Sequence, residues 1–324
     1  MAGTVHRKAR RAGGPRHKPD CVECSMQWAR NVGGAGGASI VGMDTSTALP
    51  PLYISHGSPM TALDAGEAGA FWRRLGPAIS ATFGTPKAIL AVSAHSLTRE
   101  PVLMAAPRHE AVYDFSGFPD ALYRLRYDAP GAPALAERVA ALLRGAGLPV
   151  HVDSDGGLDH GIWTPLRSMF PDADIPVLPL AWPPNWKPEA LFELGEALAP
   201  LAGEGVLVMG SGAITHNLRL FAGGRGAIDA PEFPESAAFR TWVRDEVAAR
   251  DWPALFDYRA QAPHAAHMHP SDEHWLPFYV AAGAGGRDAT GQRLHDSLTY
   301  GHLGMDTYAF GPQAGRLAET LGPY

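Results

Sequence analysis

The organisation of this chain is set by residues 88–95, AILAVSAH, in which an uncharged run leads into a histidine. Six apolar or small residues in succession are typical of a strand that is buried on both faces of a sheet. His95 lies two residues beyond that strand, and open α/β sheets bind ligands at the carboxyl ends of their strands. The stretch therefore predicts a central strand that delivers an imidazole to a site.

Similar strands and intervening helices are expected along most of the chain. The other apolar runs are Leu52–Ser55, Val102–Ala105, Val150–Val152, Val177–Ala181 and Val206–Met209. Segments of helical period occur at Ala65–Ile79, Ala132–Leu143, Pro188–Leu201, Ser236–Ala249 and His274–Ala284. This alternation predicts a three-layer α/β fold, with a mostly parallel or mixed sheet covered by helices on both faces. We expect a single domain, because α/β enzymes of this length routinely form one.

The composition and charge of the chain argue against several classes of partner. The chain has 324 residues, of which 46% are apolar and 19% charged, and no apolar run is long enough to cross a membrane. Before a Gly/Ala/Ser run that starts at Gly33, seven Lys or Arg residues face only Asp20 and Glu23. The rest of the chain has an excess of acidic residues, which disfavours nucleic acid and anionic membranes as partners.

The basic segment, residues 1–45, is expected to be a disordered tail or an over-extended start, and residues 46–324 to be the catalytic domain. The tail lacks the periodic apolar residues that build a core, so we expect that deleting residues 1–42 leaves folding and activity intact. A faint alternative for this Arg-rich start is an organellar transit peptide.

Both cysteines, Cys21 and Cys24, lie in the tail. A Cys-x-x-Cys pair with His17 would supply part of a zinc site, but incidental thiols are the favoured interpretation. Because the rest of the chain has no cysteine, no disulfide framework holds the fold, and a cytoplasmic setting is expected.

Two histidines follow predicted strands closely. His56 comes directly after Leu52–Ser55 in the motif SHGSPM, where Gly57 permits a sharp turn, and His95 is flanked by small residues. Each alone would more often be a packed or capping histidine. Their matching positions at strand ends favour metal ligands.

A third histidine, His216, ends the segment GSGAITH at residues 210–216. The glycines permit an alternative in which this loop cradles a phosphate. It lacks the spacing of a dinucleotide-binding or phosphate-binding loop, however, and it ends in His-Asn rather than Lys.

A fourth histidine, His160, follows Asp159 in the motif DHGIW. His160 is a candidate acid or base, and the alternative is a helix-capping Asp159 beside a structural histidine.

The fifth candidate, His274, comes from a tract with four histidines between residues 264 and 274. Most such clusters are solvated. His274 is selected because it opens the apolar helical run at residues 274–284, while the adjacent Glu273 stays open as a carboxylate ligand. A set of three imidazoles suits zinc, copper, nickel or iron and leaves coordination positions for substrate.

The order of these motifs resembles the 4,5-DOPA extradiol dioxygenase family, within the superfamily of the protocatechuate 4,5-dioxygenase catalytic subunit. The likeness covers about residues 50–285. It is carried by SHGSPM (55–60), SAH (93–95), DHGIW (159–163), FPDADIPV (170–177), GSGAITHNLR (210–219) and EHWLP (273–277).

The resemblance implies one divalent metal ion per chain. His56 and His95 match metal ligands, and His274 matches the third ligand of the DOPA-type branch. His216 matches a further ligand or the active-site base, and His160 matches a histidine near the substrate. The protocatechuate branch has a glutamate as its third ligand. The native metal therefore stays open, with Fe(II) needed for turnover and Zn(II) readily held by an all-histidine set.

The resulting expectation is an extradiol dioxygenase that opens a small, DOPA-like catechol with O2 to a semialdehyde. His216 would remove a catechol proton, and His160 would stabilise or protonate the oxygenated intermediate. The alternatives are a zinc hydrolase and a non-catalytic metal-binding protein of this fold. The oligomeric state stays open. Six aromatic residues are candidates for the pocket wall or the core: Tyr113, Phe115, Trp163, Trp182, Trp186 and Trp275.

Overall fold

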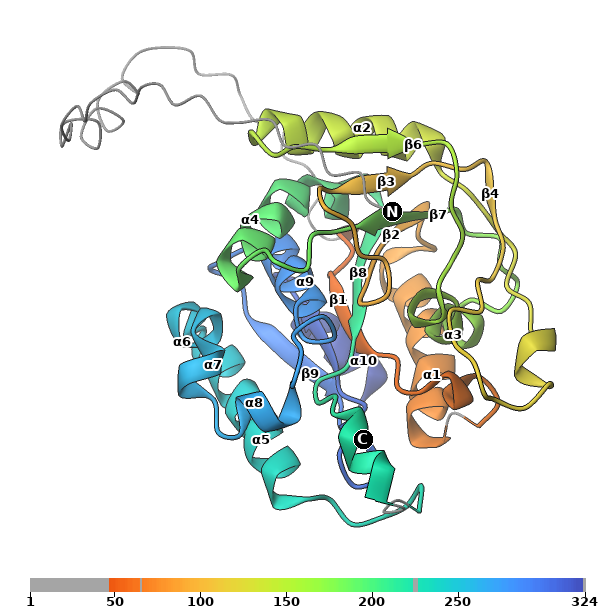
Figure 1. The fold of residues 1–324 in the computed structure, drawn as a ribbon. Helices are drawn as coiled ribbons and strands as arrows, with labels where there is room; N and C mark the ends of the chain where they lie inside the picture. The colour runs from red at the N-terminus through yellow and green to blue at the C-terminus, as the bar shows by residue number, and fades with distance from the viewer. Residues whose placement is uncertain (1–46, 65, 224–226, 323–324) are drawn as a thin grey trace, which may run out of the picture. The chain divides into compact units, whose positions relative to one another are not determined.

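A mixed sheet of eight strands forms the middle layer of the protein (Figure 1). The computed structural model describes residues 47–64, 66–223 and 227–322, which belong to one compact unit. The four central strands run parallel to one another, whereas β12 and β9 join antiparallel at one side. The strand order is β6 (His151–Asp153), β3 (Val102–Met104), β7 (Val177–Ala181), β2 (Ala88–Ser93), β8 (Val206–Gly212), β1 (Leu52–Ser55), β12 (Thr307–Phe310) and β9 (Gly291–His295).

Helices cover both faces of this sheet, so the three-layer α/β prediction is confirmed (Figure 1). One face packs against α1 (Gly66–Phe83), α3 (His160–Met169) and α10 (Ala314–Leu321). The other packs against α2 (Pro133–Gly145), α4 (Pro188–Leu198), α5 (Pro234–Ala249) and α9 (Pro277–Gly285). The short helices α6 (Trp252–Phe256), α7 (Tyr258–Gln261) and α8 (Ala265–Met268) connect α5 to α9.

Strand β2 shows why the sheet needs two covering layers. Its side chains alternate between the faces, with Leu90 and Val92 in one hydrophobic core and Ile89 and Ala91 in the other. All six residues of β2 are buried. A continuous apolar run is therefore the expected sequence of this central strand.

The outer strands differ from the expectation. The run at Val150–Val152 is not a buried strand, because β6 is an edge strand whose three residues are all exposed. The sequence analysis missed β9 and β12. Gly291–His295 is largely polar, and Thr307–Phe310 is only four residues long, so neither carries a strong strand pattern.

The last predicted helix begins later than expected. His274 does not open it, because α9 starts at Pro277 and residues 273–276 form a turn. Helix α9 is buried on all sides between α4 and the sheet. Its apolar character is therefore continuous rather than amphipathic, and the run itself does not show where the helix begins.

The predicted tail lies outside the described residues, as do Cys21, Cys24 and His17. Its dispensability therefore stays a prediction. We expect a chain lacking residues 1–42 to keep its oxygen consumption and a single cooperative unfolding transition, measured beside the full chain. Failure of the shortened chain to fold would contradict this.

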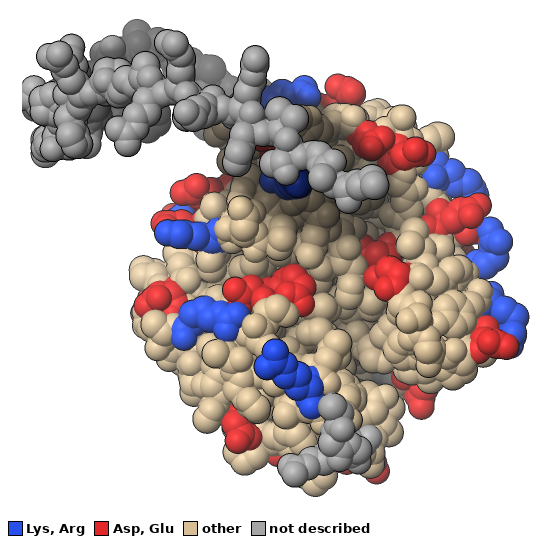
Figure 2. All heavy atoms as spheres, in the orientation of Figure 1, with Lys and Arg blue, Asp and Glu red and all other residues tan. Residues whose placement is uncertain are grey.

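The described helices include none that is both long and apolar enough to cross a membrane. The face seen in Figure 2 is formed mostly by uncharged residues, with acidic and basic side chains scattered among them.

Glycines let the segment before α9 approach β8 closely. A Cβ atom at Gly212 would lie 2.0 Å from the carbonyl oxygen of His274, and one at Gly210 would lie 2.3 Å from that of Pro277. The glycines therefore serve backbone packing, and this close packing argues against the phosphate-loop alternative.

Replacing Gly212 by Ala is expected to lower the free energy of unfolding by about 1–3 kcal/mol, because the added methyl must push the His274 backbone away. The same replacement at Gly315 in α10 is a matched control, since a Cβ there meets nothing within 4 Å. It should stabilise the protein by up to about 1 kcal/mol. Denaturant titration of both variants measures the difference, and equal effects would contradict it.

Candidate active site

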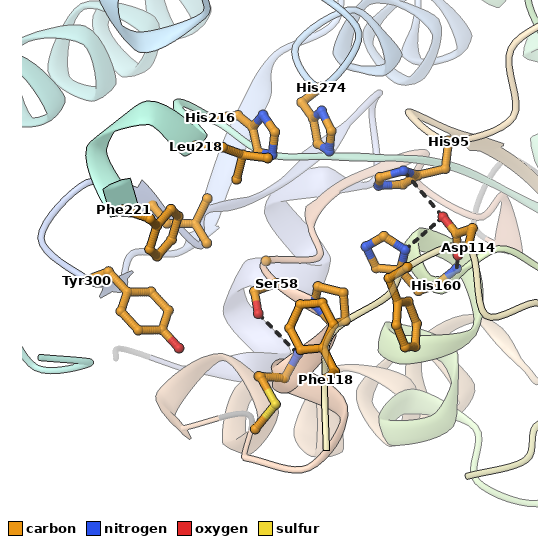
Figure 3. Close-up of a pocket in the computed structure, with 15 residues that line it drawn as sticks. Ser58, His95, Asp114, Phe118, His160, His216, Leu218, Phe221, His274 and Tyr300 are labelled. Carbon is orange, nitrogen blue, oxygen red and sulfur yellow. Dashed lines mark hydrogen bonds and ion pairs between the residues drawn. The ribbon is translucent and has the colours of Figure 1, made fainter. Parts of the chain in front are cut away.

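The carboxyl ends of β1, β2 and β8 open onto a pocket of about 460 Å³. His95, His160, His216 and His274 line it, and Figure 3 shows their rings grouped on one side. His56 lies directly behind them and is fully buried. The five histidines selected from the sequence therefore meet at one place, although they come from segments far apart in the chain.

His56 is held with one ring nitrogen directed at this site. Its backbone N–H donates to the Gly212 carbonyl, and its Nδ1 lies 2.9 Å from the hydroxyl oxygen of Ser211. The single Ser211 hydroxyl hydrogen is donated to the carbonyl of Gly161, so Ser211 accepts from His56 Nδ1–H. His56 Nε2 then carries a free lone pair, and it lies 3.1 Å from His95 Nε2.

Asp114 orients two of the histidines. Its Oδ2 accepts from His160 Nδ1 at 2.9 Å and lies 3.4 Å from His95 Nδ1, and its Oδ1 accepts from the backbone N–H of His160 (Figure 3). Partial burial tends to raise the pKa of Asp114, but the hydrogen bonds from His160 outweigh it and lower that pKa. The carboxylate therefore favours a proton on Nδ1 of both rings, which leaves Nε2 of each directed away from Asp114.

Asp159 does not cap α3 with its side chain as the alternative interpretation required. Its carboxylate instead accepts hydrogen bonds of 2.6 Å from the hydroxyls of Ser93 and Ser96. These bonds tie the start of α3 to the end of β2. Asp159 thus fixes the position of His160 relative to His95.

His274 is positioned through its own carbonyl oxygen, which accepts from Tyr53 Oη and from the backbone N–H of Ala213, both at 2.9 Å. Its Nδ1 lies 3.3 Å from Glu273 Oε1. The ring of His216 stacks on that of His274, with centroids 3.5 Å apart and planes 9° apart. The turn before α9 and the segment after β8 therefore bring His274 and His216 together.

Two separate groups of donor atoms could each hold a metal ion. One contains His56, His95 and His160, and the other contains His216, Glu273 and His274. The set expected from the resemblance draws on both, since the ring centroids of His56, His95 and His274 are 4.8 to 5.4 Å apart. The 3.1 Å between His56 Nε2 and His95 Nε2 is within the about 4 Å that two nitrogens on one metal allow.

The histidines are electrically suited to bind a cation. Burial lowers the pKa of His56 and of His274 well below the ordinary value, and neighbouring imidazoles lower both further. Burial also lowers the pKa of His95, and it lowers that of His216 to about 4. These rings are neutral at neutral pH, as metal ligands and proton acceptors must be.

The other histidines of the tract do not line the pocket. His264 and His267 are exposed, and His269 is buried with its Nε2 bonded to the Ile214 carbonyl.

The structure separates the six aromatic residues that the sequence left open between pocket wall and core. Trp163, Trp182 and Trp275 are core residues, and Trp186 lines a separate hollow. Tyr113 hydrogen-bonds the Leu125 carbonyl outside the lining. Phe115 alone of the six lines the pocket, together with Phe118, Phe221 and Tyr300, which the sequence analysis missed.

Asp114 and Ser211 were also missed. Asp114 lies in an irregular segment with no periodicity, and nothing in the sequence pairs it with a histidine 46 residues away. Ser211 stands inside GSGAITH, but there it was indistinguishable from a loop serine.

The comparisons with known proteins agree with this geometry. Residues 50–311 match the model of a family described as the catalytic LigB subunit of aromatic ring-opening dioxygenase. A relative from Beta vulgaris named 4,5-DOPA dioxygenase extradiol is 37% identical over 263 residues, which is 80% of this chain and 95% of the relative. A relative of that name from Escherichia coli (strain K12) is 37% identical over 247 residues, covering 74% and 86%.

A crystal structure of an uncharacterized protein from Escherichia coli K12 has a related fold. Its TM-score is 0.64 at 29% sequence identity, and the match covers 81% of this chain and all of the other. Together with the family match, these relatives favour a dioxygenase over a zinc hydrolase or a non-catalytic protein. The chain belongs to the aromatic ring-opening dioxygenase family and is an extradiol dioxygenase.

Proposed function

We propose that this dioxygenase opens the ring of a small catechol with O2 to give a ring-opened semialdehyde. The observation that carries the proposal is the convergence of five histidines, four of them lining one pocket, in a chain of this family. His56, His95 and His274 would hold one divalent metal ion. Their donor set fits, because buried neutral imidazoles suit iron and zinc alike. When bound, Fe(II) would supply the Lewis acidity and redox chemistry that ring opening needs.

His216 is the proposed base. Its imidazole lines the pocket, and because its pKa is lowered to about 4 it is neutral and can accept a proton from the catechol hydroxyl. A ring nitrogen that is permanently coordinated could not exchange protons in this way. Stacking against His274 orients the imidazole beside the ligands.

His160 is the proposed second proton-handling group. With Nδ1 held by Asp114, its Nε2 is the nitrogen free to accept or donate a hydrogen bond toward the reacting oxygen atoms. Phe115 packs edge-on against the imidazole, with centroids 5.5 Å apart, and restricts its rotation.

Oxygen uptake tests the proposal. Protein loaded with Fe(II) is expected to consume one O2 for each catechol opened and to produce the yellow absorbance of a semialdehyde, whereas zinc-loaded protein should consume none. A panel of catechols, with hydroquinone as the control diol, would cover the substrate class. Iron-loaded protein that takes up no oxygen with any catechol would contradict the proposed function.

Asp114 is expected to act by positioning the rings of His160 and His95. Asp114→Asn should lower the rate by about 10- to 100-fold, because the amide cannot hold both His160 and His95 in the same tautomer. Asp120→Asn, in the same loop but away from the pocket lining, should leave the rate unchanged. Oxygen-uptake rates at saturating catechol and the pH profile of each variant measure this. Similar losses in both variants would contradict the assigned role.

A further inference from the structure

The pocket has two chemically different sides. The histidines and Asp114 occupy one side. Figure 3 shows Phe221 and Tyr300 on the side away from His95, His160 and Asp114, with Leu218 between them and His216. A catechol whose diol faces the histidines would direct its ring substituent toward the apolar part of the pocket. The volume of about 460 Å³ falls in the range of sites for drug-sized ligands and is far larger than a bare catechol needs.

The apolar side is held by hydrogen bonds to the segment after β8, which carries Thr215 and His216. The Thr215 hydroxyl donates to the His302 carbonyl at 2.7 Å and accepts from the backbone N–H of Gly304 at 2.8 Å. These bonds fix the hairpin of β10 (Leu298–Thr299) and β11 (Leu303–Gly304), whose turn carries Tyr300. The hairpin that carries Tyr300 is therefore fixed directly to the segment that carries His216.

Tyr300 adopts a backbone conformation that bulky residues avoid, with a φ of 58°. Such strain costs about 1–3 kcal/mol and clusters at ligand sites. Its ring packs edge-on against Phe221, with centroids 5.0 Å apart, and lines the pocket. The strained backbone at Tyr300 therefore places an aromatic ring on the pocket wall.

Leu218 lies at the rim and is 62% exposed, the largest exposure among the large hydrophobic residues of the described chain. It follows Asn217, whose side-chain amide is bonded to the His267 carbonyl at 2.6 Å and to the backbone N–H of Arg219 at 3.0 Å. Leu218 is therefore held in place, and an apolar ligand group that covers it removes its surface from water.

The lining contains no Lys or Arg among the described residues. Asp114 is its only carboxylate, and both of its oxygens are engaged by histidines. Among the lining residues that the structure describes, an anionic substituent would thus find no cationic partner to offset the hydration that it loses.

We propose that the substrate of this site is a catechol with an apolar ring substituent, rather than one whose side chain ends in a carboxylate. This inference rests on the proposed function and names its substrate class. The proposed substrate class differs from DOPA, which appears in the names of the relatives and is an amino acid.

The test compares 4-butylcatechol, 4-methylcatechol, L-DOPA and 3-(3,4-dihydroxyphenyl)propionate. With iron-loaded protein, kcat/KM should rise roughly threefold for each added methylene and should be at least about tenfold higher for 4-butylcatechol than for L-DOPA. Dissociation constants for zinc-loaded protein without oxygen should rank the compounds in the same order. This second readout does not depend on turnover.

Variants of Leu218 locate the effect. Leu218→Ala should lower kcat/KM for 4-butylcatechol by about tenfold and that for 4-methylcatechol by a clearly smaller factor. Val152→Ala is the control, because Val152 is 40% exposed on edge strand β6 and lies outside the pocket lining. Leu218→Arg should shift the preference toward the propionate by about tenfold.

The outcomes separate the two claims. No oxygen uptake with any of the four catechols would overturn the proposed function. Uptake that is fastest with L-DOPA or the propionate, with tightest binding of the same compound to zinc-loaded protein, would overturn this inference alone.

Discussion

Replacing His216 by Ala is expected to slow ring opening by about two to four powers of ten while most of the metal stays bound. The imidazole lines the pocket and is neutral at neutral pH, so its loss removes a proton acceptor. Replacing His56 by Ala should instead deplete the metal. His56 Nε2 lies 3.1 Å from His95 Nε2, and its Nδ1 is tied to Ser211, so the ring presents one fixed donor.

The measurement is metal content per chain beside the oxygen-uptake rate, after identical purification and iron loading of both variants. Circular dichroism controls for folding, because His56 is fully buried. Equal loss of metal would make His216 a ligand. His160, held by Asp114, would then be the leading candidate for the base.

A second large effect is expected at Arg240, far from the reacting atoms. Arg240→Ala should lower the free energy of unfolding by about 3–5 kcal/mol, because it leaves the fully buried Asp306 without its main partner. The Arg240 Nε donates to Asp306 Oδ2 at 2.7 Å, and its Nη1 donates to Glu232 at 2.7 Å. The Asp306 carbonyl in turn accepts from the backbone N–H of Ser55, directly before His56.

The pH dependence of this loss has a defined sign. Burial raises the pKa of Asp306 even with Arg240 beside it, and removing the arginine raises that pKa further. A group whose pKa is raised on folding favours the folded state at low pH and loses that contribution as the pH rises through the raised pKa. The variant should therefore lose less stability in acid than at neutral pH, as denaturant titrations at several pH values would show.

Two controls accompany this prediction. Arg138→Ala breaks an exposed pair with Glu204 and should have little measurable effect. The double variant Arg240→Met with Asp306→Leu should recover most of the lost stability, because it removes both buried charges. A loss at Arg240 no larger than that at Arg138 would contradict the assignment.

The sequence alone determined the class of fold and identified the histidines that the structure brings to one pocket. Strand β2 is buried on both faces, so residues 88–92 are continuously apolar, and such a run can be recognised without a structure. His56 and His95 could be selected because each follows such a strand. The carboxyl ends of parallel strands meet at one edge of the sheet, so the two histidines were expected to lie close together.

Only the tertiary structure decided how those histidines are held and what surrounds them. Asp114 and Ser211 act on rings 46 and 155 residues away, and contacts between distant segments leave no period in the sequence. The apolar side of the pocket comes from Leu218, Phe221 and a hairpin near residue 300, each too short to show a pattern. Residue types and spacing thus specify the reactive groups, whereas the order in which distant strands pair determines the partners of those groups and the shape of the pocket.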